Sequence, residues 1–394
     1  MTCKNLLRVS LVTLIAAGLL GGCGTIGRTT DTVTGWLGFG KKRLAEPATL
    51  VEFAPKRQMM RAWTASAGEA GRGLFTPAVE GNAVYAAGES GRVMRINLQN
   101  GSETWRVDTG KKLAAGVGTG SGLVLVGGLK GELIALDAAS GAKRWEVAMP
   151  SVAVAPPAVA GDLVVVRTGN GQVHGLNAAD GSRKWLYTRQ LPALSLQGVS
   201  ALAVRDGLAY AGFPGGKLAA IQLANGLQAW EVSVSTPRGA TELERVNDVV
   251  GMPALDDQRV CAVTYQGRVA CYERTKGNLI WARETSSDAG LAMDELYVYV
   301  TDDKDAVTAY DKNTGRAAWR QDKLANRQLT APLSLGKYVV VADVEGYVHL
   351  ISGEDGSFAA RAQGDGPTRA SPIDIGPGFA VQSTKGGVVA FKLN

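Results

Sequence analysis

The sequence predicts an all-β protein, an eight-bladed β-propeller made of four-stranded antiparallel blades. The first observation is a pattern that is clearest at residues 131–145, GELIALDAASGAKRW, and that recurs eight times. Its copies begin at Gly91, Gly131, Gly171, Gly216, Gly267, Asp305, Gly346 and Gly386, between 38 and 51 residues apart. The second observation is that a period near forty residues is the length of one four-stranded blade.

Each repeat has the sequence of a short antiparallel meander. In the first repeat, apolar and β-branched runs at 83–87, 92–98 and 103–107 are separated by turns at Gly81, Gly91 and Gly101. Such turns need residues that tolerate positive φ angles. No stretch after residue 60 has a sustained helical period. We therefore expect most of the 51 glycines to lie in turns and bulges.

Most repeats end in a tryptophan. These residues are Trp105, Trp145, Trp185, Trp230, Trp281 and Trp319. Their regular placement favours plates packed between blades, with each indole N–H bonded to a carbonyl, over a ligand platform that would use one or two of them. The seventh repeat has Ala360 at this position, where Phe358 is expected to fill part of the space.

The two ends of the sequence predict how the ring closes. The eighth copy covers residues 386–394 and stops before its fourth strand, whereas residues 59–64, MMRAWT, precede the first full repeat. We expect the N-terminal strand around Trp63 to supply the fourth strand and the eighth tryptophan. Closure would remove exposed sheet edges, which promote aggregation.

The first residues predict export and lipidation. Lys4 and Arg8 precede an apolar stretch at 9–20 that is too short for a typical membrane span. The following Leu-Gly-Gly-Cys resembles a bacterial lipobox, with Cys23 as the lipidated residue carrying a diacylglyceryl group and palmitate; an ordinary signal peptide is the alternative. We predict a lipoprotein signal peptide at 1–22, a lipidated N-terminus and tether at 23–56, and the propeller at 57–394.

The composition argues against several function classes. The net charge of +6, which becomes +4 without residues 1–22, has no basic cluster of the kind that binds nucleic acid. There is no metal-binding His/Cys spacing, catalytic triad or phosphate loop. His174 and His349 fall at equivalent strand positions and are expected to be structural, and residues 302–305 (DDKD) are expected to form a turn and not a calcium loop.

Two cysteines remain for the propeller. Pairing Thr264 with Arg268 across a three-residue loop places Cys261 opposite Cys271, with Cα atoms about 4.5 Å apart if the pair is not hydrogen-bonded. We expect a cross-strand disulfide in an oxidising compartment. Two buried free thiols are the alternative.

The longest gaps between tryptophans contain two unusual segments. Leu191, Leu194 and Leu196 make the first apolar for a loop, and the second contains Glu242, Glu244, Arg245 and Asp248. Loops at the faces of a ring are where binding residues concentrate. An apolar knob beside a charged cluster suits a protein-binding patch. The residues alone support equally a structural alternative, in which the leucines cover a blade edge and the charges are solvated.

The whole pattern resembles the BamB family, the lipoprotein subunits of the outer-membrane β-barrel assembly machinery. Residues 191–198, LPALSLQG, match that family's Pro-x-Leu-Ser-Leu-Arg-Gly segment, and residues 241–250, TELERVNDVV, match its Thr-Glu-(Ile/Leu)-x-Arg-(Leu/Val)-x-Asp-Val-Asp segment. Gln197 replaces the arginine and Val250 replaces the second aspartate, so salt bridges made there in relatives would be absent.

The resemblance implies a non-enzymatic scaffold without cofactors. It would be lipid-anchored in the outer membrane and face the periplasm. It would bind the POTRA domains of BamA, other Bam subunits and, more weakly supported, unfolded outer-membrane proteins. Leu194 and Leu196 would make apolar contacts, and Glu244, Arg245 and Asp248 polar ones, with Gln197 in the same segment.

The sequence leaves two other functions open, a quinoprotein dehydrogenase and a polymer-binding module. The repeat also resembles the tryptophan-docking repeat of quinoprotein dehydrogenases, which bind pyrroloquinoline quinone and calcium. Those enzymes are longer, and many have a disulfide between adjacent cysteines, which this chain lacks. A periplasmic module that binds peptidoglycan or another acidic polymer is the third possibility.

Overall fold

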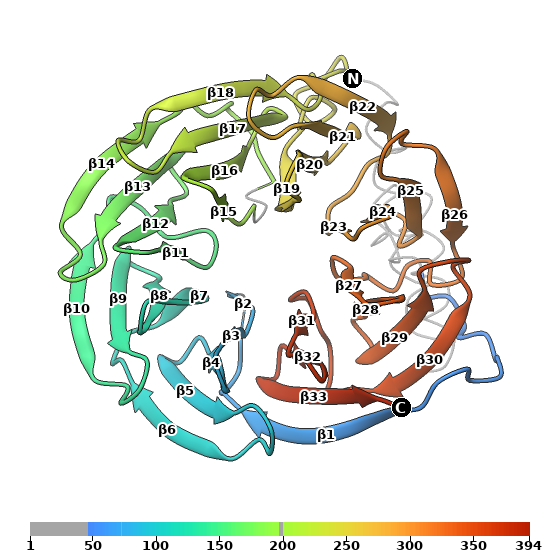
Figure 1. The fold of residues 1–394 in the computed structure, drawn as a ribbon, viewed down its shortest axis with the longest axis horizontal. Helices are drawn as coiled ribbons and strands as arrows, with labels where there is room; N and C mark the ends of the chain where they lie inside the picture. Colours follow the sequence, from blue (N-terminus) through green and yellow to red (C-terminus); the bar gives the residue numbers. More distant parts are fainter. Residues whose placement is uncertain (1–45, 72, 197–199) are drawn as a thin grey trace, which may run out of the picture. The chain divides into compact units, whose positions relative to one another are not determined.

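The computed structural model describes residues 46–71, 73–196 and 200–394. This part of the chain contains strands and no helix, and Pro47–Asn394 forms one compact unit. No helix among the described residues is long and apolar enough to cross a membrane. Eight sheets surround a central opening (Figure 1). The all-β, eight-bladed prediction is confirmed.

Within blades 1–7 the strands run in chain order from the centre to the rim. Blade 1 comprises β3 (Ala78–Glu80), β4 (Ala83–Ala87), β5 (Arg92–Asn97) and β6 (Glu103–Asp108). Blade 2 comprises β7 (Leu113–Gly120), β8 (Leu123–Gly128), β9 (Glu132–Asp137) and β10 (Lys143–Ala148), with β2 (Leu74–Phe75) pairing parallel to β7. Blade 3 comprises β11 (Ala158–Ala160), β12 (Leu163–Arg167), β13 (Gln172–Asn177) and β14 (Arg183–Thr188). Blade 4 comprises β15 (Ala203–Arg205), β16 (Leu208–Phe213), β17 (Lys217–Gln222) and β18 (Gln228–Ser233).

The second half of the ring repeats this arrangement. Blade 5 comprises β19 (Val249–Leu255), β20 (Arg259–Thr264), β21 (Arg268–Glu273) and β22 (Leu279–Glu284). Blade 6 comprises β23 (Gly290–Met293), β24 (Tyr297–Thr301), β25 (Val307–Asp311) and β26 (Ala317–Gln321). Blade 7 comprises β27 (Leu333–Leu335), β28 (Tyr338–Ala342), β29 (Tyr347–Ser352) and β30 (Phe358–Gln363). Blade 8 comprises β31 (Ile373–Asp374), β32 (Gly378–Gln382), β33 (Gly387–Leu393) and, outermost, β1 (Met59–Ser66).

The N-terminal strand closes the ring as predicted. β1 pairs antiparallel with β33, from Met59 opposite Leu393 to Ser66 opposite Gly387. Trp63 lies on this strand and is buried. Segments from the two ends of the sequence therefore form one blade, and the turn glycines around the ring have the expected positive φ angles, for example 59° at Gly81 and 73° at Gly101.

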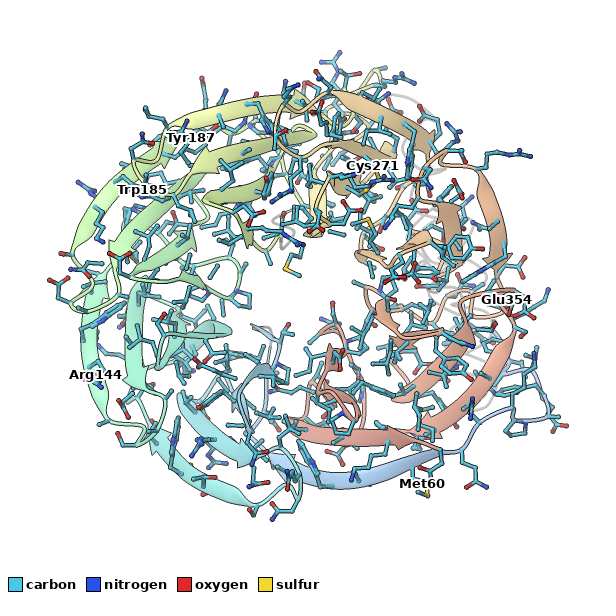
Figure 2. All side chains as sticks on the ribbon, viewed as in Figure 1. Met60, Arg144, Trp185, Tyr187, Cys271 and Glu354 are labelled. Carbon is cyan, nitrogen blue, oxygen red and sulfur yellow. A yellow bond between two sulfur atoms is a disulfide. The ribbon has the colours of Figure 1, made fainter. Side chains whose placement is uncertain are left out.

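The tryptophans join neighbouring blades. Each indole N–H donates to the carbonyl that follows the third strand of the next blade, and the acceptors are Leu98 for Trp63, Ala138 for Trp105, Ala178 for Trp145, Leu223 for Trp185, Arg274 for Trp230, Lys312 for Trp281 and Gly353 for Trp319. The distances are 2.7–3.2 Å. Side chains fill the seams between the blades, with Trp185 on the outer strand of blade 3 (Figure 2). Each of these tryptophans thus occupies a structural position at a seam between two blades.

Blade 7 departs from this rule for a topological reason. In the other blades the tryptophan rests against the glycine of the next blade's outer hairpin, as Trp319 does against Gly356. The outer strand of blade 8 is β1, which comes from the other end of the sequence, so no hairpin joins it to β33. Ala360, buried in blade 7, therefore has no such turn to face. Phe358 is buried one seam earlier, between blades 6 and 7.

The propeller unit begins before residue 57. Residues 47–58 run in extended form along the outside of blade 7, where Leu50, Val51 and Phe53 pack against the seam between blades 6 and 7. The last part of the segment expected to be a tether is therefore a packed component of the ring. Cys23 and the signal peptide lie outside the described residues.

Candidate functional site

Two connections between blades make the candidate site. The first loop, residues 189–202, joins β14 to β15, and the second loop, residues 234–248, joins β18 to β19. Strands alternate in direction, so every connection from an outer strand to the next inner strand emerges on the same face, which we call the loop face. The two loops flank blade 4 on this face. Gln197 lies outside the described residues.

Leucine side chains of both loops are exposed. Leu194 is 45% exposed, Leu196 is 41% exposed and Leu243 is 73% exposed. Leu191 is half-buried against the turn at Gly171. The first loop therefore uses one leucine to pack on its own blade and presents two to solvent. Apolar side chains grouped in this way are typical of surfaces that a protein partner covers.

Asp248 connects the two loops. Its side chain is only 2% exposed, although it lies in the charged segment of the second loop. One carboxylate oxygen accepts from the backbone N–H of Leu196 at 2.7 Å, and the other from that of Gly215 at 3.3 Å. Burial raises the pKa of Asp248. The geometry gives this residue a positioning role in place of the direct polar contact expected from the sequence.

Arg167 holds the first loop at a second point. This side chain at the end of β12 is 6% exposed, and its Nη1 donates to the carbonyl of Ser200 at 3.0 Å. Its guanidinium lies 5.2 Å from the centre of the Phe213 ring. Burial lowers the pKa of Arg167 to about 10, so it stays charged at neutral pH. The loop is thus fixed at Leu196 and at Ser200 by buried groups of opposite charge.

The second loop contains a capping box. The hydroxyl of Thr241 accepts from the N–H of Glu244 at 3.3 Å, and the Glu244 carboxylate accepts from the N–H groups of Thr241 at 3.1 Å and Ala240 at 2.7 Å. This reciprocal pair stabilises a single tight turn. The same N–H groups lower the pKa of Glu244. Its carboxylate therefore shapes the loop, although the side chain is at the surface.

Arg245 is the predicted polar residue that stays available. Its Nε donates to the carbonyl of Gly239 at 3.1 Å, and its Nη1 lies 3.4 Å from the Glu242 carboxylate. The Arg245 side chain remains 51% exposed and that of Glu242 remains 67% exposed. Surface ion pairs of this kind contribute little to stability. Both charges can therefore be used for a partner at small cost to the fold.

A hydrogen-bond network, in which Asn247 and Ser235 are buried and Gln266 is exposed, supports the turn. The Asn247 amide donates to the carbonyl of Gln266 at 3.0 Å and accepts from the Ser235 hydroxyl at 2.5 Å. With its amide oriented to satisfy both atoms, Gln266 donates to the carbonyls of Glu244 and Val246 at 2.8 and 2.9 Å. Sequence reasoning missed Arg167 and Gln266. In the sequence, Arg167 is marked only as a charge at the end of an apolar strand, and Gln266 only as a residue in a β-turn.

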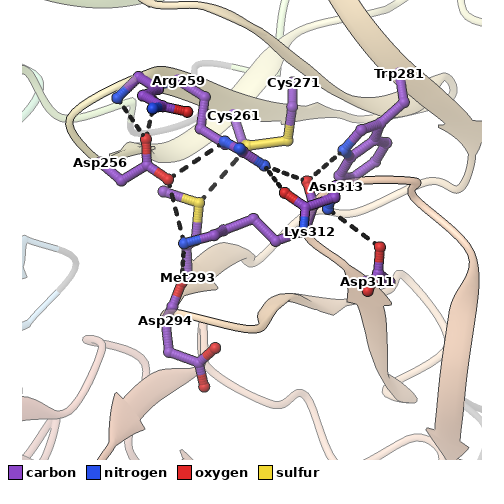
Figure 3. The surroundings of a disulfide bond; sticks show 11 residues. Asp256, Arg259, Cys261, Cys271, Trp281, Met293, Asp294, Asp311, Lys312 and Asn313 are labelled. Carbon is purple, nitrogen blue, oxygen red and sulfur yellow. Dashed lines mark hydrogen bonds and ion pairs between the residues drawn. A yellow bond between two sulfur atoms is a disulfide. The ribbon is translucent and has the colours of Figure 1, made fainter.

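The disulfide lies away from the two loops, inside blade 5. Cys261 is opposite Cys271, as the predicted register requires, and the two are joined with Cα atoms 4.0 Å apart. Both are fully buried, and the sulfur of Met293 in blade 6 lies 3.9 Å from that of Cys261 (Figure 3). The bond ties the two central strands of the blade together.

The remaining candidates are structural in this geometry. His174 and His349 do occupy equivalent positions, opposite Val166 and Val341, and both are buried. Burial lowers the pKa of His174 to about 4. Asp302 begins a blade turn, where it accepts from the N–H groups of Lys304 and Ala306 and pairs with Arg320 at 2.7 Å. The described residues contain no group of three or more metal-binding side chains.

The opposite face has two wide, shallow clefts of about 770 and 710 Å³. In the larger one, Lys312 lies 3.2 Å from the Asp256 carboxylate and donates to the carbonyl of Asp294 at 2.9 Å. These contacts join blade 5 to blade 6 (Figure 3).

Comparison with known proteins agrees with the geometry. A family model described as outer membrane protein assembly factor BamB matches residues 89–321 and 303–393. The outer membrane protein assembly factor BamB of Pseudomonas aeruginosa is 47% identical over 366 residues, 92% of this chain and 96% of the relative. That of Burkholderia pseudomallei is 40% identical over 347 residues, 88% of this chain and 91% of the relative.

Solved structures divide into close and distant likenesses. The crystal structure of BamB from Moraxella catarrhalis superposes with a TM-score of 0.79 at 27% identity, over 85% of this chain and all of that one. The quinohemoprotein alcohol dehydrogenase from Comamonas testosteroni superposes with a TM-score of 0.67 at 14% identity, over 85% of this chain and 76% of the enzyme. The second likeness is one of fold alone.

Proposed function

The chain belongs to the BamB family of outer membrane protein assembly factors, and from this premise we propose that it is a non-enzymatic scaffold whose loop face binds the POTRA domains of BamA within the Bam complex. It aids the assembly and insertion of β-barrel proteins into the outer membrane. Lipidation at Cys23 attaches it to that membrane on the periplasmic side.

The contact between Asp248 and Leu196 carries this proposal. A buried carboxylate from one loop fixes the backbone of the other, so Leu194 and Leu196 are presented in a defined conformation beside the exposed Arg245 and Glu242. A preformed apolar knob with a polar rim loses little conformational entropy on binding. Solvated leucines that merely covered a blade edge would not need such support.

Binding of the lipid-free chain to purified POTRA domains of BamA tests the proposal. Leu194→Asp and Leu196→Asp should each abolish binding and leave thermal unfolding nearly unchanged, because both side chains are exposed at the surface and neither belongs to a core between blades. Leu227→Asp is the matched control, since Leu227 is 62% exposed in a turn on the opposite face. Unaltered affinity in both loop variants would show that the partner binds elsewhere.

A subsidiary part of the proposal concerns unfolded outer-membrane proteins. The outer strands of the blades present free edges, and β22 starts with the exposed side chains of Leu279 and Ile280. An extended client segment could add to such an edge by β-augmentation. Cross-linking of an unfolded barrel protein to a photoreactive residue at position 279, but not at position 296, would support this part, because Leu296 is 66% exposed in the turn between β23 and β24 and not on an outer strand.

A further inference from the structure

The N-terminal segment Pro47–Gln58, which we call the strap, is bound to the ring by an unusually complete set of contacts. Its Ala48, Leu50, Val51 and Phe53 side chains are half-buried, whereas Thr49 and Glu52 between them are exposed. The N–H of Ala48 donates to the carbonyl of Ala325 at 2.9 Å, and that of Lys56 donates to the carbonyl of Ala359 at 2.8 Å. The strap then continues directly into β1.

Arg327 grips the start of the strap. Its side chain is 2% exposed, and its Nη1 donates to the carbonyl of Ala48 at 2.9 Å. Its Nε donates to the buried carboxylate of Asp343 at 2.7 Å, and its Nη2 pairs with Glu345 at 2.5 Å. A buried arginine that donates a hydrogen bond to a strap carbonyl indicates that the strap is part of the folded ring.

Arg361 grips the middle of the strap. Its Nη1 donates to the carbonyl of Val51 at 3.0 Å. Its guanidinium lies beside two rings, 5.0 Å from the centre of Phe53 and 5.3 Å from that of Phe358. The two rings also stack on each other, with centres 5.3 Å apart. Phe53 therefore completes an aromatic and cationic pocket that blade 7 cannot complete alone.

The two arginines are coupled through a buried histidine. Arg361 Nε can only donate, so His349 Nδ1, 3.2 Å away, must accept, and this fixes the neutral Nε2–H tautomer. His349 Nε2 then donates to Asp343, 3.1 Å away, which is also the partner of Arg327. We call Arg327, Asp343, His349 and Arg361 the clamp. Through Arg327 and Arg361, this connected network donates hydrogen bonds to two carbonyls of the strap, those of Ala48 and Val51.

The clamp lies on a different part of the ring from the candidate site. Blade 7 is two blades beyond blade 5 and four beyond blade 3, so blade 6 separates it from the blades that carry the two loops (Figure 1). We propose that the strap is a latch: the clamp holds the point where the N-terminal segment joins the propeller on blade 7, so that the anchored end stays away from the partner-binding loops. The positioning of the anchored end rests on the proposed function, whereas the attachment of the strap to the ring does not. Release would free the twelve strap residues, which span about 40 Å when extended.

Limited proteolysis of the full chain tests the latch. Glutamyl endopeptidase can cut after Glu52, which lies between the gripped Val51 and Phe53. Two variants remove contacts of the strap: Phe53→Ala leaves the ring intact, and Arg361→Ala leaves the cleavage site intact. Each should increase the rate of cleavage after Glu52 at least about tenfold, because charge-assisted contacts are among the strong ones. Thr49→Ala, at an exposed strap position, is the control and should cut at the wild-type rate.

The outcomes separate the latch from global unfolding and from the proposed function. Near-ultraviolet circular dichroism of Phe53→Ala should stay that of the wild type. A wild-type strap cut as fast as the variants would overturn the latch. If the strap is released but β-barrel assembly by the lipidated Phe53→Ala protein is undiminished, the positioning role is wrong. Failure of the unaltered chain to bind POTRA domains would instead overturn the proposed function.

Discussion

The backbone N–H of Leu196 donates to the buried carboxylate of Asp248 across 2.7 Å, and this single bond joins two loops through residues that are 52 positions apart in the sequence. Asp248 of the second loop therefore supports Leu196 of the first loop from inside the protein. The two segments act as one surface, in which the leucines and Arg245 face solvent while the aspartate does not.

Replacing Asp248 with alanine should weaken both stability and binding. Two backbone N–H groups would lose a buried ionised acceptor, which costs about 2–3 kcal/mol of unfolding free energy. The affinity for POTRA domains should fall about tenfold or more because the first loop is no longer preorganised. Denaturant unfolding and binding titrations measure both effects. Asp257→Ala, an exposed aspartate on the opposite face, should change unfolding by less than about 0.5 kcal/mol and leave binding intact.

A consensus argument would place a tryptophan in every repeat to increase stability. The seam geometry predicts instead that both the loss of a tryptophan and its introduction into blade 7 destabilise the ring. Trp145→Phe removes the 2.8 Å bond to the carbonyl of Ala178 and part of the seam packing, and should cost about 2 kcal/mol. Ala360→Trp restores the repeat pattern but should also destabilise, by about 1–3 kcal/mol or more, because the site is 2% exposed and no hairpin faces it. A higher denaturant midpoint for Ala360→Trp would contradict this account.

Loss of the disulfide should weaken blade 5 without disturbing the loop face. Cross-linking Cys261 to Cys271 closes a loop of about ten residues, for which chain entropy predicts roughly 2–3 kcal/mol. The double variant Cys261→Ala/Cys271→Ala should unfold at lower denaturant and lose its sensitivity to reductant. POTRA binding should be unchanged, because the sulfurs lie in the blade interior. An unaffected midpoint would indicate that the bond adds nothing to the folded ring.

The sequence contained enough information for the ring because its signals are local and repeated. Asn-Gly and Ser-Gly turns fix the hairpins, each tryptophan finds its carbonyl in the next copy of the same repeat, and the strand around Trp63 lacks any other partner. The register of Cys261 and Cys271 followed from the length of one turn.

The site could be predicted only in part because its support comes from distant residues. The leucines were found by their unsuitability for a loop, but the buried Asp248 is held against the backbone of Leu196, 52 residues earlier in the sequence. Glu244 looked like a contact residue, yet its carboxylate closes a capping box. The strap was missed for the same reason, since Arg327 and Arg361 follow their strap partners by 279 and 310 residues in the sequence.

Acid should loosen the clamp through Asp343. Burial alone would raise its pKa, but hydrogen bonds from His349, the N–H of Tyr347 and Arg327 outweigh this effect and leave the pKa of Asp343 lowered. The unfolded chain titrates this carboxyl near pH 3.9. A lowered folded pKa therefore contributes stability that is complete above about pH 4 and is lost as the pH falls through the folded value.

Comparing the wild type with Asp343→Asn across pH isolates this contribution. At pH 5–8 the variant should be less stable by a constant amount of about 3 kcal/mol, because Arg327 loses its buried counter-ion. Below pH 4 the difference should shrink. Burial lowers the pKa of His349, so the unfolded state takes up the His349 proton at a higher pH than the folded state does, and this lowers the stability of the wild type as the medium becomes more acidic. Exposed Asp303→Asn should show no such pattern, and a difference that persists undiminished to pH 3 would rule out Asp343 as the ionised centre of the clamp.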